Sequence, residues 1–210
     1  MNTITAIEPR NKRNKSYELA LDDGRTFCVD EEVVVKHGLK PGMLINEEQL
    51  REWIWEADIR AACDLALHYL GFRMRTRKQL YDYLKRKGFN EPVIEEVICK
   101  MEEYRFLDDE EYALRWIQSR KLSQPSGRRK IAYELMNKGI ARDVLETALD
   151  TVTQEEEEEL VCQLAEKYYA KYSNLPGKEC MAKVSQALLR RGFDWDIISR
   201  AIRRLDVDLS

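Results

Sequence analysis

The sequence has no long apolar run, no paired cysteines and almost no histidine. Nowhere in its 210 residues is there a stretch of the roughly 18 to 20 apolar residues that span a bilayer, and no leader of basic and then apolar residues opens the chain. The five cysteines are odd in number and far apart, so we expect neither a disulfide framework nor a zinc site. These absences predict a soluble, cytoplasmic protein whose thiols stay reduced.

Signatures of catalysis are missing as well. The two histidines, His37 and His68, have no neighbouring partner that would indicate a catalytic triad or a metal site. The chain also lacks the glycine-rich phosphate loops, the GxSxG nucleophile turn and the HExxH zinc motif. We therefore predict a protein with no catalytic residues, no metal and no cofactor, which is not an enzyme.

Charge is plentiful, but it is unevenly distributed along the chain. Charged residues make up 35% of the sequence, and the net charge is only −3. Seven cations and one acid, Asp82, lie between Arg73 and Lys87, and no acid lies between Arg120 and Lys130. A local basic face, rather than the net charge, decides whether a protein can bind nucleic acid. Because the helix dipole disfavours cations just before a helix, the first basic run favours contact with a partner.

The first 50 residues differ from the rest because they contain short runs with strand character. The strand candidates are Thr3–Ile7, Tyr17–Leu21 and Thr26–Val29. A hairpin-type turn, Asp22-Asp23-Gly24, joins the last two. Val33–Val35 fits either a strand or a short helix. So few strands are marginal alone, and we expect this β-rich module to pack on the neighbouring helix or on a partner.

From Glu47 onward the apolar spacing is helical, and one pattern occurs three times. The pattern is Leu80-x3-Leu84-x3-Gly88-Phe89, Ile131-x3-Leu135-x3-Gly139-Ile140 and Val184-x3-Leu188-x3-Gly192-Phe193. The glycines are 51 and then 53 residues apart. A period near 50 in a helical stretch is typical of tandem units, each too small to bury its own apolar face.

Each repeated glycine is predicted to end a helix. A glycine after a helix can adopt the left-handed conformation, and the apolar residue after it then contacts the last helical turn in a Schellman motif. Lys87, Lys138 and Arg191 directly precede the glycines, where a cation complements the helix C-terminus. We expect the glycines to matter for folding only.

These features predict a mainly α-helical fold of three tandem three-helix repeats in an elongated, curved array after the β-rich module. The expected boundaries are 1–50, 51–106, 107–153 and 154–210. The first helices of the repeats are expected at Ala57–Tyr69, Asp108–Leu122 and Glu155–Lys171. Their aromatic residues, such as Trp116 and Tyr168, keep helical spacing, which favours a place in the core over base stacking.

Several of these motifs resemble those of RecX regulatory proteins. The first RecX unit is resembled by the run Thr76-Arg77-Lys78-Gln79-Leu80, then Leu84 to Gly88, and then Phe106-Leu107-Asp108-Asp109-Glu110-Glu111-Tyr112-Ala113. Gly127-Arg128-Arg129-Lys130-Ile131 is similar to the second and most distinctive unit. The third repeat is looser but keeps Leu188 to Gly192. The resemblance covers about residues 57 to 206.

The resemblance implies a modulator of the RecA recombinase. Such proteins lie along the groove of the filament that RecA forms on single-stranded DNA, and they inhibit its ATP hydrolysis, coprotease activity and strand exchange. The implied partners are therefore RecA and the DNA strand within the filament, with weak binding to free DNA left open. We expect a monomer that contacts no membrane and acts in DNA repair and the SOS response.

The contact residues are predicted from the basic runs, since the family motifs are largely structural. The leading candidates are Arg73, Arg75, Arg77, Lys78, Arg128, Arg129 and Lys130, followed by Arg190 and Arg191. The third repeat has Met181 and Ala182 where the first two repeats have basic pairs. A basic contact at that position of the third repeat is therefore not expected.

Two other functions remain open from the sequence. Three-helix units with basic starts also describe helix-turn-helix domains, so a stand-alone DNA-binding regulator is the main alternative. Three similar units without a single obvious recognition helix disfavour it. The other alternative is a helical scaffold for an unrelated protein.

Overall fold

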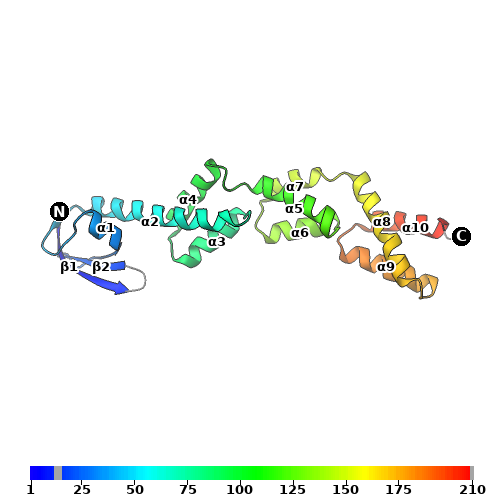
Figure 1. Ribbon diagram of the computed structural model, residues 1–210, viewed down its shortest axis with the longest axis horizontal. Coiled ribbons are helices and arrows are strands. Elements are labelled where there is room, and N and C mark those ends of the chain that lie inside the picture. The colour runs from blue at the N-terminus through cyan, green and yellow to red at the C-terminus, as the bar shows by residue number, and fades with distance from the viewer. Residues whose placement is uncertain (12–15, 209–210) are drawn as a thin grey trace. The chain divides into compact units, whose positions relative to one another are not determined.

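The structure, a computed structural model, describes residues 1–11 and 16–208 and divides into two compact units (Figure 1). The first unit consists of Met1–Arg73 and Leu80–Phe106, and the second of Met74–Gln79 and Leu107–Ser210. Ten helices and four strands lie within the described residues. The last two residues of the predicted third repeat, 209 and 210, lie outside them.

The first unit opens with a small antiparallel sheet in the order β3-β2-β1-β4. Its strands are β1 (Asn2–Asn11), β2 (Ser16–Leu21), β3 (Thr26–Asp30) and β4 (Leu44–Ile45). The predicted β-rich start and the turn between β2 and β3 are confirmed, and Gly24 lies in that turn with φ of 86°. The two-residue β4 was not predicted, because only its pairing with Asn2 and Thr3 distinguishes it from a loop.

Two helices follow the sheet strands, α1 (Glu31–Lys36) and α2 (Glu47–Gly71). The ambiguous Val33–Val35 belongs to α1, whose first turn is capped by the Asp30 side chain. A second cap, Asn46, begins α2 ten residues before the expected first helix, since no glycine or proline interrupts the chain up to Tyr69. Leu50 of α2 is fully buried against the sheet.

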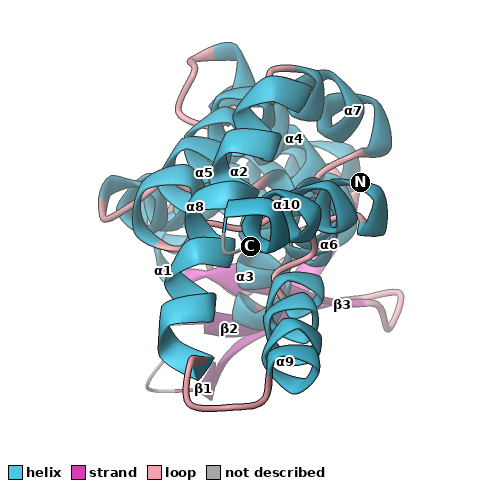
Figure 2. Cartoon of the chain, turned by 90° about the vertical axis from the view of Figure 1, so that its right-hand side faces the viewer, coloured by secondary structure: helices cyan, strands magenta, loops and turns pink. Residues whose placement is uncertain are grey.

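The remaining helices follow the predicted three-helix pattern, and helices dominate the chain (Figure 2). They are α3 (Arg77–Lys87), α4 (Glu91–Glu103), α5 (Asp109–Ser123), α6 (Arg128–Asn137), α7 (Arg142–Asp150), α8 (Gln154–Tyr172), α9 (Gly177–Arg190) and α10 (Trp195–Asp208). Helix α3 contributes its first residues to the second unit. Among the described residues, no helix is both long and apolar enough to cross a membrane.

All three predicted glycine turns are Schellman motifs. Gly88, Gly139 and Gly192 have φ of 97°, 84° and 81°. The N–H of the residue after each glycine donates to the carbonyl five residues earlier, as from Ile140 to Leu135 over 3.1 Å. Each glycine N–H donates in turn to the carbonyl three residues earlier. The repeat pattern therefore encodes one local structure three times.

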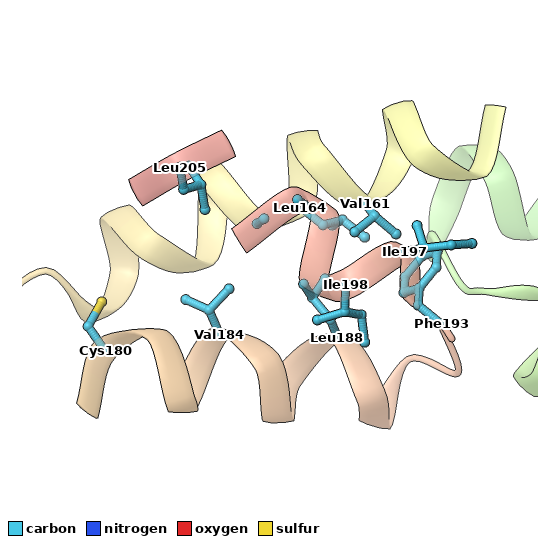
Figure 3. Packing of buried hydrophobic residues seen from close by; sticks show 11 residues of the cluster. Val161, Leu164, Cys180, Val184, Leu188, Phe193, Ile197, Ile198 and Leu205 are labelled. Carbon is cyan, nitrogen blue, oxygen red and sulfur yellow. The ribbon is translucent and has the colours of Figure 1, made fainter. Parts of the chain in front are cut away.

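Each repeat of the second unit has its own apolar core. In the third repeat, α8, α9 and α10 enclose Phe193, which is 1% exposed, between Leu188 and Ile197 (Figure 3). In the second, α5, α6 and α7 enclose Ile131 and Leu135. These cores hold the helix ends that carry the predicted site residues.

Candidate nucleic-acid interface

The start of α3 contacts the end of α6 within the second unit, and we call this contact the first joint. The Thr76 side chain is fully buried, and its Oγ1 donates to the Lys138 carbonyl over 2.6 Å. The same Oγ1 accepts from the Gln79 amide at 3.3 Å, while Gln79 Oε1 accepts from the Thr76 amide at 3.2 Å. This reciprocal pair is a capping box. Thr76 therefore both caps the start of α3 and donates a hydrogen bond to the end of α6.

The second joint repeats this arrangement between the start of α6 and the end of α9. Gly127 takes the position of Thr76, and its backbone N–H donates to the Arg191 carbonyl over 2.9 Å. A Cβ on Gly127 would lie 2.4 Å from the Gly192 carbonyl oxygen. A Cβ on Gly192 would lie 2.5 Å from the Lys130 amide nitrogen. The backbones thus meet where only glycine fits.

An acid from the following repeat caps the helix at each joint. Asp109 Oδ1 accepts from the Arg77 amide at 2.8 Å, and Glu157 Oε1 accepts from the Arg128 amide at 2.9 Å. Carboxylates are favourable at helix N-termini. Glu157 is 5% exposed, and burial raises its pKa above the usual value, although the bond from Arg128 opposes this shift. The negative charge of these acids offsets the positive charge of the arginines at the starts of α3 and α6.

The cation before each repeated glycine lies over an aromatic ring. Lys87 Nζ is 5.5 Å from the Tyr83 ring centre, and Lys138 Nζ is 4.2 Å from that of Trp116. In the third repeat, Arg191 Cζ is 5.9 Å from the Tyr168 ring centre. The sequence explained these cations by the helix dipole alone, and the structure adds cation–π contacts.

A basic groove of about 460 Å³ lies beside the second joint. Four of its lining residues are cationic, and among the described residues that line it none is acidic. The lining consists of Gln124, Lys130, Tyr168, Lys171, Tyr172, Ala187, Arg190 and Arg191. The groove thus brings together three residues that the sequence proposed as contacts from different runs, Lys130, Arg190 and Arg191. We call it the α8–α9 groove.

One of the residues that line this groove, Ala187, has a small side chain. Ala187 lies five residues before its repeat glycine, where the first repeat has Tyr83 and the second has Glu134. Tyr83 stacks on Tyr69 with ring centres 4.1 Å apart, and Glu134 accepts from Trp116 Nε1 at 3.0 Å. Ala187 is the smallest of the three side chains at this position, and it lines the groove.

Arg191 has a structural role in addition to its place in the groove. Its Nε donates to the Tyr168 hydroxyl over 2.6 Å, and its Nη1 donates to the Pro125 carbonyl over 2.7 Å. These bonds tie α8 and α9 to the segment before α6. Arg190, the next residue towards the N-terminus, is exposed at the rim of the groove.

Arg128 and Arg129 do not line this groove. Arg128 is half-buried, and its guanidinium donates to the Val152 carbonyl at 3.4 Å and approaches Asp150 at 3.5 Å. The Arg129 side chain is 69% exposed and lies 3.5 Å from Asp194. It lines a second groove that also contains Asp196, so the charge there is mixed.

The remaining predicted residues lie around the start of α3. Arg73 is exposed in the first unit, whereas Arg75 is half-buried in the second. Arg77 and Lys78 are exposed, and the Lys78 side chain packs against Gly139 at the first joint. A Cβ on Gly139 would lie 2.3 Å from Lys78 Cβ.

The sequence reasoning missed Lys171 and Tyr172, which the end of α8 supplies to the groove. Both lie outside the basic runs that guided the prediction. It placed Tyr168 in the core, and Tyr168 does pack against the core of the third repeat, where it is half-buried and also lines the groove. The sequence does show the small Ala187 at a position that is larger in the other repeats.

Comparison with protein families matches three successive parts of the chain. Residues 62–101 match the first three-helix domain of RecX, residues 108–149 the second and residues 155–202 the third. The chain is also 36% identical, over 208 residues, to regulatory protein RecX of Halalkalibacterium halodurans, covering 96% of this chain and 77% of that one. The chain belongs to the RecX family.

Other relatives agree along nearly the whole chain. Regulatory protein RecX of Clostridium perfringens strain 13 is 35% identical over 210 residues, covering 98% of this chain and 97% of the relative. A crystal structure of a regulatory protein RecX matches with a TM-score of 0.68 and 28% identity, over 95% of this chain and 98% of that one. RecX from Lactobacillus salivarius matches with a TM-score of 0.68 and 32% identity, over 72% of this chain and 99% of that one. The three-helix repeats are therefore the fold of a RecX-family regulatory protein.

Proposed function

We propose that this RecX-family chain binds the filament of RecA on single-stranded DNA and inhibits its ATP hydrolysis, coprotease activity and strand exchange. The observation that carries the proposal is the family membership, established over 96% of the chain by a relative that is a regulatory protein. In a cell, the proposed consequence is control of DNA repair and of the SOS response by a cytoplasmic monomer.

Repetition suits this task because a filament presents the same surface many times. Weak contacts from successive repeats combine into strong binding when they can be made simultaneously. The joints support this by fixing neighbouring helix ends, as in the bonds from Thr76 to Lys138 and from Gly127 to Arg191. The predicted basic residues are the proposed contacts, and binding should therefore weaken as salt rises.

Co-sedimentation with preassembled filaments tests the proposal. The chain should pellet with cognate RecA filaments on single-stranded DNA, held by a non-hydrolysable ATP analogue, and less with RecA alone. No pelleting above the level without filament would overturn the proposal. Specific binding to one duplex sequence, with no preference for the filament, would favour the helix-turn-helix alternative instead.

A pair of double variants tests the contribution of the contact residues. R73Q/R129Q removes two exposed cations from the proposed contacts. R115Q/R142Q is the matched control, because Arg115 and Arg142 are exposed cations whose partners, Glu111 and Glu146, lie on their own helices. The first variant should bind filaments more weakly than the control. Equal binding by both would remove Arg73 and Arg129 from the interface.

A further inference from the structure

The α8–α9 groove contains cations that the chain itself leaves uncompensated. Among the described residues, no carboxylate forms an ion pair with Lys130, Lys171 or Arg190. The next cation, Arg191, is held by the neutral Tyr168 hydroxyl and the Pro125 carbonyl. By contrast, the exposed Arg129 lies beside Asp194, and Arg115 and Arg142 lie beside acids of their own helices. The groove is therefore a concentrated positive site open to an anionic partner.

Aromatic rings lie among these cations. The rings of Tyr168 and Tyr172 are 15° from parallel, with centres 6.4 Å apart, and both line the groove. The Tyr168 hydroxyl is occupied by Arg191. Tyr172 is half-buried and has Lys171 Nζ 5.5 Å from its ring centre. A cation next to an accessible ring can contact a phosphate while the ring contacts a base.

We propose that the α8–α9 groove binds single-stranded nucleic acid, with phosphates at Lys130, Lys171 and Arg190 and one base stacked on Tyr172. Positively charged grooves that contain aromatic rings recognise single strands in this way, because every base has a face that can stack. In a duplex the bases are already stacked on one another, so Tyr172 would find no partner. An acidic peptide would satisfy the cations but would leave the ring unused.

The size and position of the groove agree with such a ligand. Its volume of about 460 Å³ lies in the range of small-ligand pockets, roughly 300 to 1,000 Å³. Its lining includes Ala187, at a position where the other repeats have the larger Tyr83 and Glu134. Of the residues in the basic runs at the starts of α3 and α6, the groove contains Lys130 alone among those that line it.

This inference rests on the proposed function for its biological meaning. It deepens that function by proposing that the chain contacts the nucleic-acid strand directly. It can be tested without RecA. Fluorescence anisotropy of labelled oligothymidylate, titrated with the full chain between about 50 and 200 mM salt, gives both the affinity and its salt dependence.

The charge arm compares K171Q/R190Q with K178Q/R203Q. The control removes one lysine and one arginine from exposed positions of the same unit that do not line the groove. Each phosphate contact with a single strand contributes about 0.7 to the slope of log affinity against log salt. The groove variant should therefore lose about 1.4 from the magnitude of that slope, and the control should keep it. Equal losses in both variants would overturn the proposal.

The aromatic arm compares Y172L with Y172F. Loss of one stacked base should weaken oligothymidylate binding by at least about fivefold in Y172L, whereas Y172F should bind like the unmodified chain. Unchanged binding by Y172L would overturn the single-strand assignment. Unlabelled polyglutamate should compete with the labelled oligothymidylate less well than unlabelled oligothymidylate does, at equal concentrations of residues. Equal competition would show a general polyanion site and would also overturn the single-strand assignment.

The outcomes separate this inference from the proposed function. If the unmodified chain pellets with RecA filaments but K171Q/R190Q and its control bind oligothymidylate equally, the groove assignment fails and the filament proposal stands. If the groove variants lose oligothymidylate binding but the chain ignores filaments, the groove assignment stands and the filament proposal fails.

Discussion

Gly127 donates a hydrogen bond to Arg191 at the second joint, and Arg191 donates one back to the segment just before Gly127. The Gly127 N–H donates to the Arg191 carbonyl over 2.9 Å, and Arg191 Nη1 donates to the carbonyl of Pro125, two residues before Gly127, over 2.7 Å. Arg191 also borders the α8–α9 groove. The residue that fixes the third repeat to the second therefore also helps to shape the proposed binding surface.

Replacing Arg191 should weaken the joint even when its charge is kept. In R191K, a single ammonium group cannot reproduce two bonds made by different guanidinium nitrogens, to Tyr168 and to Pro125. We expect a loss of about 1 to 3 kcal/mol in the free energy of unfolding, measured by urea denaturation. The adjacent R190K is the control and should unfold like the unmodified chain. Equal stability of the two variants would contradict the structural role of Arg191.

The three repeat glycines should respond differently to alanine. G88A forces alanine into the left-handed region, at a cost of about 1 to 2 kcal/mol, but its Cβ meets nothing within 4 Å. G192A adds a collision with the backbone of Lys130, at 2.5 Å from its amide nitrogen. Urea denaturation should therefore show a larger loss for G192A than for G88A. Equal losses would show that only the backbone angle matters.

The sequence was sufficient to predict the helical repeats because each rests on local chemistry. The turn at Gly139 needs only a glycine followed by an apolar residue, and both requirements can be seen in the sequence. The start of α8 is also local: Thr153 and Glu156 form a capping box, and they lie three residues apart, as this motif requires.

The groove could not be predicted because its residues come from separate elements. Lys130, Lys171 and Arg190 meet only when α6, α8 and α9 are packed together. A basic run in the sequence does not show which way each side chain points. Arg128, Arg129 and Lys130 are consecutive, yet the first contacts Val152, the second Asp194, and only the third lines the groove.

Thr76 offers a test of the first joint. T76V keeps the shape of the side chain but removes both hydroxyl bonds, to the Lys138 carbonyl and from the Gln79 amide, at a fully buried position. Leaving those groups without partners should cost about 1 to 3 kcal/mol of unfolding free energy. T76S keeps the hydroxyl and should recover most of the loss. A T76V protein as stable as T76S would show that the hydroxyl makes no net contribution.

Glu157 should make stability depend on pH. Burial raises its pKa in the folded protein above that in the unfolded chain. The folded state therefore binds the Glu157 proton more tightly than the unfolded chain does. The stabilisation from protonated Glu157 is complete below the unfolded-state pKa of about 4.3, and it is lost as pH rises through the folded-state pKa.

The E157Q variant isolates this effect, because its amide oxygen can still accept from the Arg128 N–H. The stability of E157Q relative to the unmodified chain should be greater at pH 7 than at pH 4, measured by urea denaturation at both values. A stability difference that stays constant between the two pH values would contradict the raised pKa.

The central claim is that this RecX-family chain restrains the RecA filament. The most direct measurement is the rate of ATP hydrolysis by the cognate RecA on single-stranded DNA while the chain is titrated in. The account predicts that the rate falls with dose and is clearly reduced at or below equimolar chain. A rate that stays unchanged up to equimolar chain would contradict it.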